Sequence, residues 1–201
     1  MANHDKKALI LDMYGVVISD PGGGLMPFVN RYFPGHVAAD VYPHWLEANV
    51  GRLSSSGFFE RVGFSGDLKR VETEYLETIG INESFYRAAD ILKEKYRLAL
   101  LSNDISDWSR YLREKYGLSQ YFEAAVVSGD VRLHKPNADI YELMLGILGV
   151  PAQKCVFVDD RRRNLNPARA LGMDVILFNS RNVPYDGKIV NNFDELVEML
   201  A

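Results

Sequence analysis

Residues 8–17 begin with a short apolar run that stops at an aspartate. Ala8 to Leu11 are all apolar, Asp12 follows them directly, and a glycine comes three residues later. A short apolar run bounded by turn residues is typical of a buried strand in a parallel sheet. In an open α/β sheet, ligands bind at the carboxyl ends of such strands, although an aspartate there also serves as a simple turn cap. The segment therefore predicts a buried first strand with Asp12 at a ligand-binding edge.

Strands and helices alternate through the second half of the sequence, where amphipathic stretches separate four further apolar runs. These runs are residues 97–101, 122–127, 155–158 and 175–178. Between the first strand and these runs, residues 25–94 show helical periodicity and no strand-like segment. The pattern predicts an α/β fold with a doubly wound, Rossmann-like parallel sheet of about five strands, interrupted by an α-helical insertion.

The composition favours a soluble globular protein. Of the 201 residues, 47% are hydrophobic and 25% are charged, with a formal net charge of −4. The 23 lysines and arginines form no long basic block, which argues against nucleic acid as a partner. No apolar run approaches the length of a membrane span, and residues 1–7 are too short and polar for a signal peptide, so we expect a cytoplasmic protein without membrane association. The single cysteine, Cys155, excludes an internal disulfide and a cysteine-based metal cluster.

Polar side chains end three of the predicted strands, and a lysine lies in a loop expected at the same edge of the sheet. These residues are Asp12, Ser102, Asn103, Asp159, Asp160 and Lys135. Three close carboxylates repel one another, so the site calls for a proton or a cation, and Mg²⁺ prefers such oxygen ligands. A hydroxyl and an ammonium suit phosphate oxygens. A carboxylate such as that of Asp12 can attack phosphorus to form an acyl phosphate.

These residues resemble, in order, the four motifs of the haloacid dehalogenase-like (HAD) hydrolase superfamily over essentially the whole chain. The motifs are Asp12-Met13-Tyr14-Gly15-Val16, Leu100-Leu101-Ser102-Asn103, Lys135-Pro136 and Val156-Phe157-Val158-Asp159-Asp160. The helical insertion resembles the cap of the branch similar to the N-terminal domain of epoxide hydrolase, in its segment from Trp45 through Gly51-Arg52-Leu53-Ser54 to Phe58-Phe59. The resemblance implies a core domain of residues 1–18 and 95–201 and a helical cap domain of residues 19–94.

The resemblance further implies a Mg²⁺-dependent phosphatase that acts on a small phosphorylated metabolite. The implied catalytic residues are Asp12 as the nucleophile, Tyr14, Ser102 and Lys135. Ser102, Asn103 and Lys135 would bind the substrate. The implied metal ligands are Asp12, the carbonyl of Tyr14, Asp159 and Asp160. No oligomeric state is implied.

Tyr14 departs from the phosphatase pattern, which has at this position an aspartate that protonates the leaving group. The 2-haloacid dehalogenases also have tyrosine there, because a departing halide needs no proton. A metal-free dehalogenase that uses Asp12 as the nucleophile is therefore one alternative, and a non-catalytic binding or regulatory protein with the same fold is another. Asp159 and Asp160 favour the phosphatase, because dehalogenases of this branch tend to have serines there. Tyr141 would also suit a dehalogenase, but we expect it to be a helix residue that packs against its neighbours.

Three consecutive arginines, Arg161, Arg162 and Arg163, follow the acidic pair. We expect them to form the solvated start of a helix, with one arginine able to pair with the acidic residues. His134 precedes Lys135 and is expected to be a solvated loop residue. The sequence does not identify the substrate, because residue spacing does not show which side chains of the insertion face the site.

Overall fold

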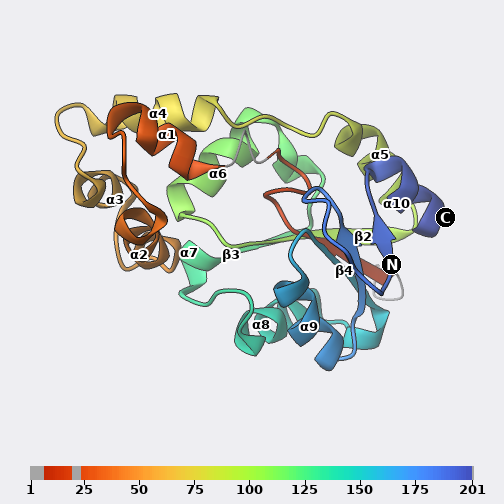
Figure 1. The fold of residues 1–201 in the computed structure, drawn as a ribbon. Coiled ribbons are helices and arrows are strands. Elements are labelled where there is room, and N and C mark those ends of the chain that lie inside the picture. The colour runs from red at the N-terminus through yellow and green to blue at the C-terminus, as the bar shows by residue number, and fades with distance from the viewer. Residues whose placement is uncertain (1–6, 20–23, 201) are drawn as a thin grey trace.

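A six-stranded, wholly parallel sheet forms the centre of the computed structural model, which describes residues 7–19 and 24–200 (Figure 1). The strands are β1 (Lys7–Leu11), β2 (Tyr96–Ser102), β3 (Ala124–Val127), β4 (Cys155–Asp159), β5 (Asp174–Phe178) and β6 (Ile189–Val190). Their spatial order is β3-β2-β1-β4-β5-β6, with parallel pairing between all neighbours. The predicted doubly wound α/β fold is confirmed. The sequence pattern predicted about five strands, because the two residues of β6 are too few to produce a recognisable run.

Helices cover both faces of the sheet. The helices are α1 (Leu25–Tyr32), α2 (Ala38–Asn49), α3 (Ser55–Val62), α4 (Leu68–Glu77), α5 (Ser84–Leu92), α6 (Ser106–Lys115), α7 (Ser128–Val131), α8 (Ala138–Leu148), α9 (Arg162–Ala170) and α10 (Phe193–Leu200). Two short 3₁₀ turns, η2 (Leu118–Gln120) and η3 (Ala152–Lys154), precede β3 and β4. Figure 1 shows α8 and α9 on one side of the sheet and α5 and α10 on the other.

The alternation of side chains along β1 explains this layering. Leu9 and Leu11 belong to the hydrophobic cluster that includes α5, α6 and α10, while Ala8 and Ile10 belong to the cluster formed with α8 and α9. Successive side chains of a strand point to opposite faces, so a strand covered on both faces must be apolar throughout. Because all four residues are buried, β1 reads as an uninterrupted apolar run in the sequence.

Helices α1 to α4 lie together to one side of the sheet, where they form the predicted helical insertion (Figure 1). Buried polar contacts join them to the sheet side of the molecule. The indole nitrogen of Trp108 on α6 donates to Glu72 Oε1 on α4 at 2.9 Å, and the hydroxyl of Ser128 donates to Asn49 Oδ1 on α2 at 2.9 Å. The fifth helix of the insertion, α5, packs against β2 and α10. The division into a core of residues 1–18 and 95–201 and a cap of residues 19–94 stays a prediction.

The strand order places the site. Strand β1 lies between β2 and β4, and the backbone N–H of Asp12 still donates to the carbonyl of Val158 at 2.9 Å. The carboxyl ends of β1, β2 and β4 are therefore neighbours at one edge, as expected for a parallel sheet. Within the described residues, no helix has the length and apolar character needed to span a membrane. A cytoplasmic location stays a prediction.

Candidate active site

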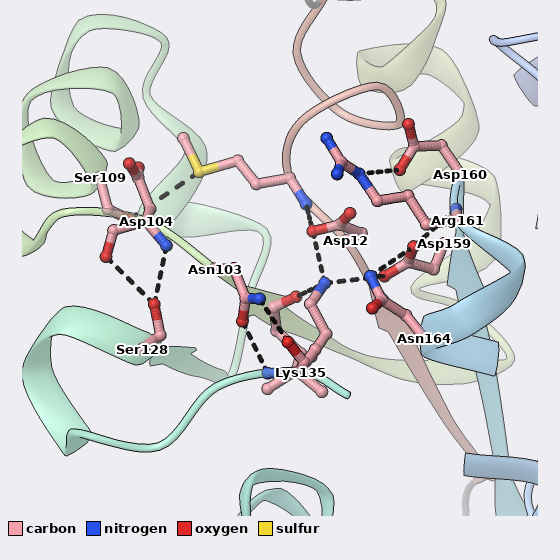
Figure 2. A network of polar contacts seen from close by, with 12 residues as sticks. Asp12, Asn103, Asp104, Ser109, Ser128, Lys135, Asp159, Asp160, Arg161 and Asn164 are labelled. Carbon is pink, nitrogen blue, oxygen red and sulfur yellow. Dashed lines mark hydrogen bonds and ion pairs between the residues drawn. The ribbon is translucent and has the colours of Figure 1, made fainter. Parts of the chain in front are cut away.

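Three buried carboxylates converge where β1 and β4 end. Asp12 follows β1, Asp159 is the last residue of β4, and Asp160 comes next. Each offers an oxygen within 4.8 Å of the others, and none of the three residues is more than 6% exposed. Figure 2 shows them on adjacent chain segments with Lys135 beneath them. The predicted convergence of these strand ends is therefore present in the structure.

Lys135 lies between two of these carboxylates. Its Nζ is 2.7 Å from Asp12 Oδ1 and 2.8 Å from Asp159 Oδ2, and it also donates to the carbonyl of Leu101 at 2.8 Å (Figure 2). These three contacts engage all three protons of the ammonium group. An incoming phosphate would therefore have to replace one of these acceptors. The backbone N–H of Met13 also donates to Asp12 Oδ1, at 2.7 Å, so Oδ2 is the less engaged oxygen of Asp12.

Burial and mutual repulsion raise the pKa values of two carboxyl groups in the cluster. Burial, followed by the negative charge of Asp159, raises the pKa of Asp12 to about 8 although Lys135 opposes this. Burial and Asp159 also raise the pKa of Asp160. Burial alone would lower the pKa of Lys135, but the carboxylates of Asp12 and Asp159 outweigh it and raise that pKa. Lys135 and Arg181 pair with these carboxylates, but the pKa values of Asp12 and Asp160 are still raised, so the cluster favours a further proton or cation.

Neighbouring residues fix the orientation of Asp159 and Asp160. The side-chain amide of Asn164 donates to both oxygens of Asp159 at 3.0 Å, and the backbone N–H of Arg161 donates to Asp159 Oδ1 at 2.8 Å. The guanidinium of Arg181 forms an ion pair with Asp160 Oδ2. Gly15 packs against the same oxygen with a φ of 80°, and a Cβ atom there would come within 2.7 Å of it. This close approach explains why the loop after β1 has a glycine at this position.

Ser102 and Asn103 occupy the end of β2 but differ in their contacts. Ser102 is fully buried, and its hydroxyl has no hydrogen-bond partner among the described residues. A buried hydroxyl without a partner is costly, so Ser102 is suited to meet a ligand oxygen. The side chain of Asn103 instead bonds both backbone polar groups of Lys135, each at 2.8 Å. Asn103 therefore positions the Lys135 loop, and a direct role for it in substrate binding stays a prediction.

The side chain of Tyr14 points to a carboxyl group that sequence reasoning left without a role. Its hydroxyl donates to Asp104 Oδ1 at 3.3 Å, and Asp104 Oδ1 also accepts from the backbone N–H of Ile105 at 2.8 Å. Asp104 is 1% exposed, and burial raises its pKa well above the ordinary value. In the sequence, Asp104 belongs to the polar run of residues 102–104 that ends β2, and this position was the signal from which its place at the site could be predicted. Whether the carbonyl of Tyr14 binds a metal stays a prediction.

Tyr141 lies outside this constellation. It is fully buried on α8, its hydroxyl donates to the carbonyl of Asn164 at 2.8 Å, and its ring meets Phe157 edge-on at 5.5 Å between centroids. Burial raises the pKa of Tyr141, so the phenol stays protonated. These contacts fit the packing role that we expected from the sequence.

A pocket of about 540 Å³ opens above Asp12, between the helical insertion and the sheet edge. Its walls include Asp12, Tyr14, Asn103, Asp104 and Lys135 from the sheet side. The insertion contributes the side chains of Tyr42, Trp45 and Leu46 on α2. His134, Arg161, Arg163 and Arg181 also line the pocket. The volume is that of a small-molecule site, and such sites typically combine an apolar wall with a few polar groups.

Comparison with a family model identifies the protein family to which this chain belongs. The model of the haloacid dehalogenase-like hydrolases matches residues 6–172, which is most of the chain. The chain belongs to this family. The resemblance predicted from the four motifs is therefore confirmed, and the carboxylate cluster of this HAD-like hydrolase is formed by two of those motifs.

Curated relatives of this HAD-like hydrolase include enzymes of two kinds. It is 32% identical over 115 residues to bifunctional epoxide hydrolase 2 of Rattus norvegicus, an alignment that covers 55% of this chain and 21% of the relative. The chain thus spans only a small part of that relative. It is 27% identical over 174 residues to a phosphorylated carbohydrates phosphatase of Thermotoga maritima, which covers 86% of this chain and 78% of the relative.

Solved structures of the family share the fold of this HAD-like hydrolase. A HAD family enzyme of Bacteroides thetaiotaomicron, in complex with magnesium and inorganic phosphate, superimposes with a TM-score of 0.77 at 18% identity, covering 90% of this chain and 98% of that one. The L-2-haloacid dehalogenase of Xanthobacter autotrophicus with covalently bound chloropropionic acid gives a TM-score of 0.70 at 18% identity, covering 97% and 98%. Both likenesses concern the fold, so the choice between phosphatase and dehalogenase must rest on the site.

Proposed function

We propose that this HAD-like hydrolase is a Mg²⁺-dependent phosphatase of small phosphorylated metabolites, with Asp12 as the nucleophile. The observation that carries the proposal is the cluster of three buried carboxylates, which offer oxygens within 4.8 Å of one another beside Lys135. A divalent cation would favour the ionised form of Asp12 and Asp160, whose pKa values stay raised although Lys135 and Arg181 lie beside them. A phosphate dianion would gain from that cation, whereas the monoanionic substrate of a dehalogenase would gain nothing from two extra carboxylates.

The donor set fits Mg²⁺. Asp12, Asp159 and Asp160 offer oxygens within 4.8 Å of one another, and the ligands of one Mg²⁺ at about 2.1 Å from the metal lie within about 4.2 Å of each other. Asp160 Oδ1 is buried and accepts no hydrogen bond from the described residues, with Arg161 Nε 3.8 Å away, so this oxygen could coordinate a cation. The ion, when bound, would neutralise these carboxylates and the substrate phosphate. The carbonyl of Tyr14 is a proposed further ligand.

The residues of the chain define the chemistry of attack. Asp12 Oδ2, which the Met13 N–H and Lys135 leave less engaged, would attack phosphorus, and the bond from phosphorus to the leaving-group oxygen would break. That oxygen would leave with the bonding electron pair and take a proton from water or from the hydroxyl of Tyr14. Water would then hydrolyse the acyl phosphate, which restores the Asp12 carboxylate. Lys135 and the unpartnered hydroxyl of Ser102 would hold the phosphoryl oxygens.

The leaving group provides the test of this proposal. Because Tyr14 replaces a carboxylic acid with a phenol, protonation of the leaving group should be weak, and a positioned acid is worth on the order of 10²- to 10⁴-fold in rate. We expect p-nitrophenyl phosphate, acyl phosphates and sugar 1-phosphates to be hydrolysed with Mg²⁺ at least about 10²-fold faster than simple alkyl phosphates. Phosphate release from a panel of these esters measures this ratio. Equal rates for p-nitrophenyl phosphate and ethyl phosphate would show that a full-strength acid is present.

The runner-up function is 2-haloacid dehalogenation without a metal, and Tyr14 is the observation that favours it. In that reaction Asp12 would displace halide, while Lys135 and Ser102 would hold the substrate carboxylate. Asp159 and Asp160 weigh against it, because an organic monoanion would gain nothing from two further buried carboxylates beside the nucleophile.

A further inference from the structure

The three consecutive arginines after the acidic pair lie in three different environments. Arg162 turns away from the pocket, where it donates to the carbonyl of Pro184 at 3.3 Å and lies 5.6 Å from the ring centre of Tyr185. Arg161 lines the pocket and faces Asp160 at 3.8 Å. Arg163 also lines the pocket, but its guanidinium makes no ion pair or hydrogen bond with the described residues. The helix start is exposed, as predicted, and it contains one arginine that lines the pocket without a partner among the described residues.

The other cations of the pocket are already paired. Lys135 contacts Asp12 and Asp159, and Arg181 pairs with Asp160. The ring of His134 interacts with the carbonyl of Lys135 at 3.0 Å. Within the part of the chain that the structure describes, Arg163 is thus the pocket cation without a partner, and it is available to an anionic group of a ligand. A guanidinium presents a fork of donors that matches a carboxylate or a phosphate in two-point contact.

The opposite wall of the same pocket is apolar and exposed. Tyr42 and Leu46 on α2 are 43% and 51% exposed although they are large hydrophobic residues, and Trp45 lies between them in the sequence with its ring edge-on to Tyr42. Exposed apolar side chains gathered at a pocket are characteristic of a ligand site. Aromatic rings of this kind favour a flat, apolar ligand group packed against them.

We propose that Arg163 forms a second anion-binding subsite, so that the pocket selects phosphomonoesters whose leaving group is flat, apolar and negatively charged. The inference rests on the proposed phosphatase function and names its substrate class. The phosphate would lie at Asp12 and Lys135, the flat body against Trp45, and the second anionic group at Arg163. A phenolic leaving group also suits a site in which Tyr14 stands in place of an acidic residue, because a phenolate departs more readily than an alkoxide.

A pair of esters of nearly the same shape, one of which carries an additional negative charge, tests the proposal. We expect the wild-type enzyme with Mg²⁺ to hydrolyse 4-carboxyphenyl phosphate with a kcat/KM about three- to tenfold higher than 4-carbamoylphenyl phosphate, mostly through KM, as suits an ion pair at an exposed arginine. Arg163→Gln should abolish this preference, so that the variant hydrolyses the two esters with similar kcat/KM. Arg163→Lys should restore part of the preference. Arg162→Gln, which removes the neighbouring charge that faces Tyr185, is the matched control and should retain the preference.

Binding to an Asp12→Asn variant separates this inference from the proposed function. Calorimetry with Mg²⁺ should show tighter binding of the carboxylate ester by a similar three- to tenfold factor, and Arg163→Gln in the same background should remove the difference. Preferential binding without turnover by the wild-type enzyme would leave the subsite standing and refute the phosphatase. Equal binding of the two esters, binding of neither, or a preference that survives Arg163→Gln would overturn the subsite.

Discussion

Asp12→Asn is expected to lower phosphate release by about four orders of magnitude or more, because an amide does not attack phosphorus. The variant should fold, since asparagine retains an oxygen for the Met13 N–H and removes one of three mutually repelling carboxylates. Phosphate release from p-nitrophenyl phosphate with saturating Mg²⁺ gives the rate, and thermal unfolding followed by circular dichroism gives the stability.

Asp107→Asn is the control for this substitution. Asp107 lies on the exposed side of α6, where it pairs with Arg110 at 3.2 Å. Its replacement should leave both activity and unfolding temperature unchanged. Substantial phosphatase activity in Asp12→Asn, with normal folding, would mean that the enzyme uses another nucleophile.

Lys135→Met should have the largest effect on stability. It removes the ammonium that lies 2.7 Å from Asp12 and 2.8 Å from Asp159, and leaves those buried carboxylates without a counter-charge. Breaking a buried ion pair in this way costs about 3–5 kcal/mol in the free energy of unfolding. Urea denaturation in the presence of EDTA should show this loss. Added Mg²⁺ should recover part of it, because a bound cation supplies the missing charge.

A second lysine provides the comparison for Lys135→Met. Lys188 pairs with Asp174 at the surface, with side chains 53% and 44% exposed, so Lys188→Met should cost less than about 1 kcal/mol. Equal free energies of unfolding for Lys135→Met and Lys188→Met in EDTA would contradict this prediction. They would mean that Asp12 and Asp159 do not carry the negative charges that Lys135 is expected to compensate.

The sheet and the nucleophile could be predicted because the relevant signals are local. Each buried strand is a short apolar run, and in a parallel sheet such runs end at a common edge. The sequence alone therefore predicts that Asp12, Ser102 and Asp159 lie close together. The family resemblance then supplied their roles. Lys135 was predicted as a phosphate-holding residue, and its simultaneous contact with Asp12 and Asp159 came from the structure.

The contacts that could not be predicted join segments with no common pattern. Arg181 reaches Asp160 because β5 and β4 are neighbours in the sheet, a relation that residue spacing does not express. The buried hydrogen bond from Trp108 to Glu72 likewise depends on how α6 meets α4. The apolar wall formed around Trp45 follows from the placement of the helical insertion over the sheet edge. The substrate class could therefore not be predicted from the sequence.

The most direct test of the central claim is one assay of the wild-type protein in two formats, each with Mg²⁺ and with EDTA. One format measures phosphate release from p-nitrophenyl phosphate, and the other measures chloride release from 2-chloropropionate. A Mg²⁺-dependent phosphatase should release phosphate with Mg²⁺, lose that activity in EDTA, and release no chloride in either buffer. Chloride release that persists in EDTA would instead establish the dehalogenase, and the absence of chloride release and of phosphate release across a broad panel of phosphate esters, with Mg²⁺ bound, would favour a non-catalytic relative.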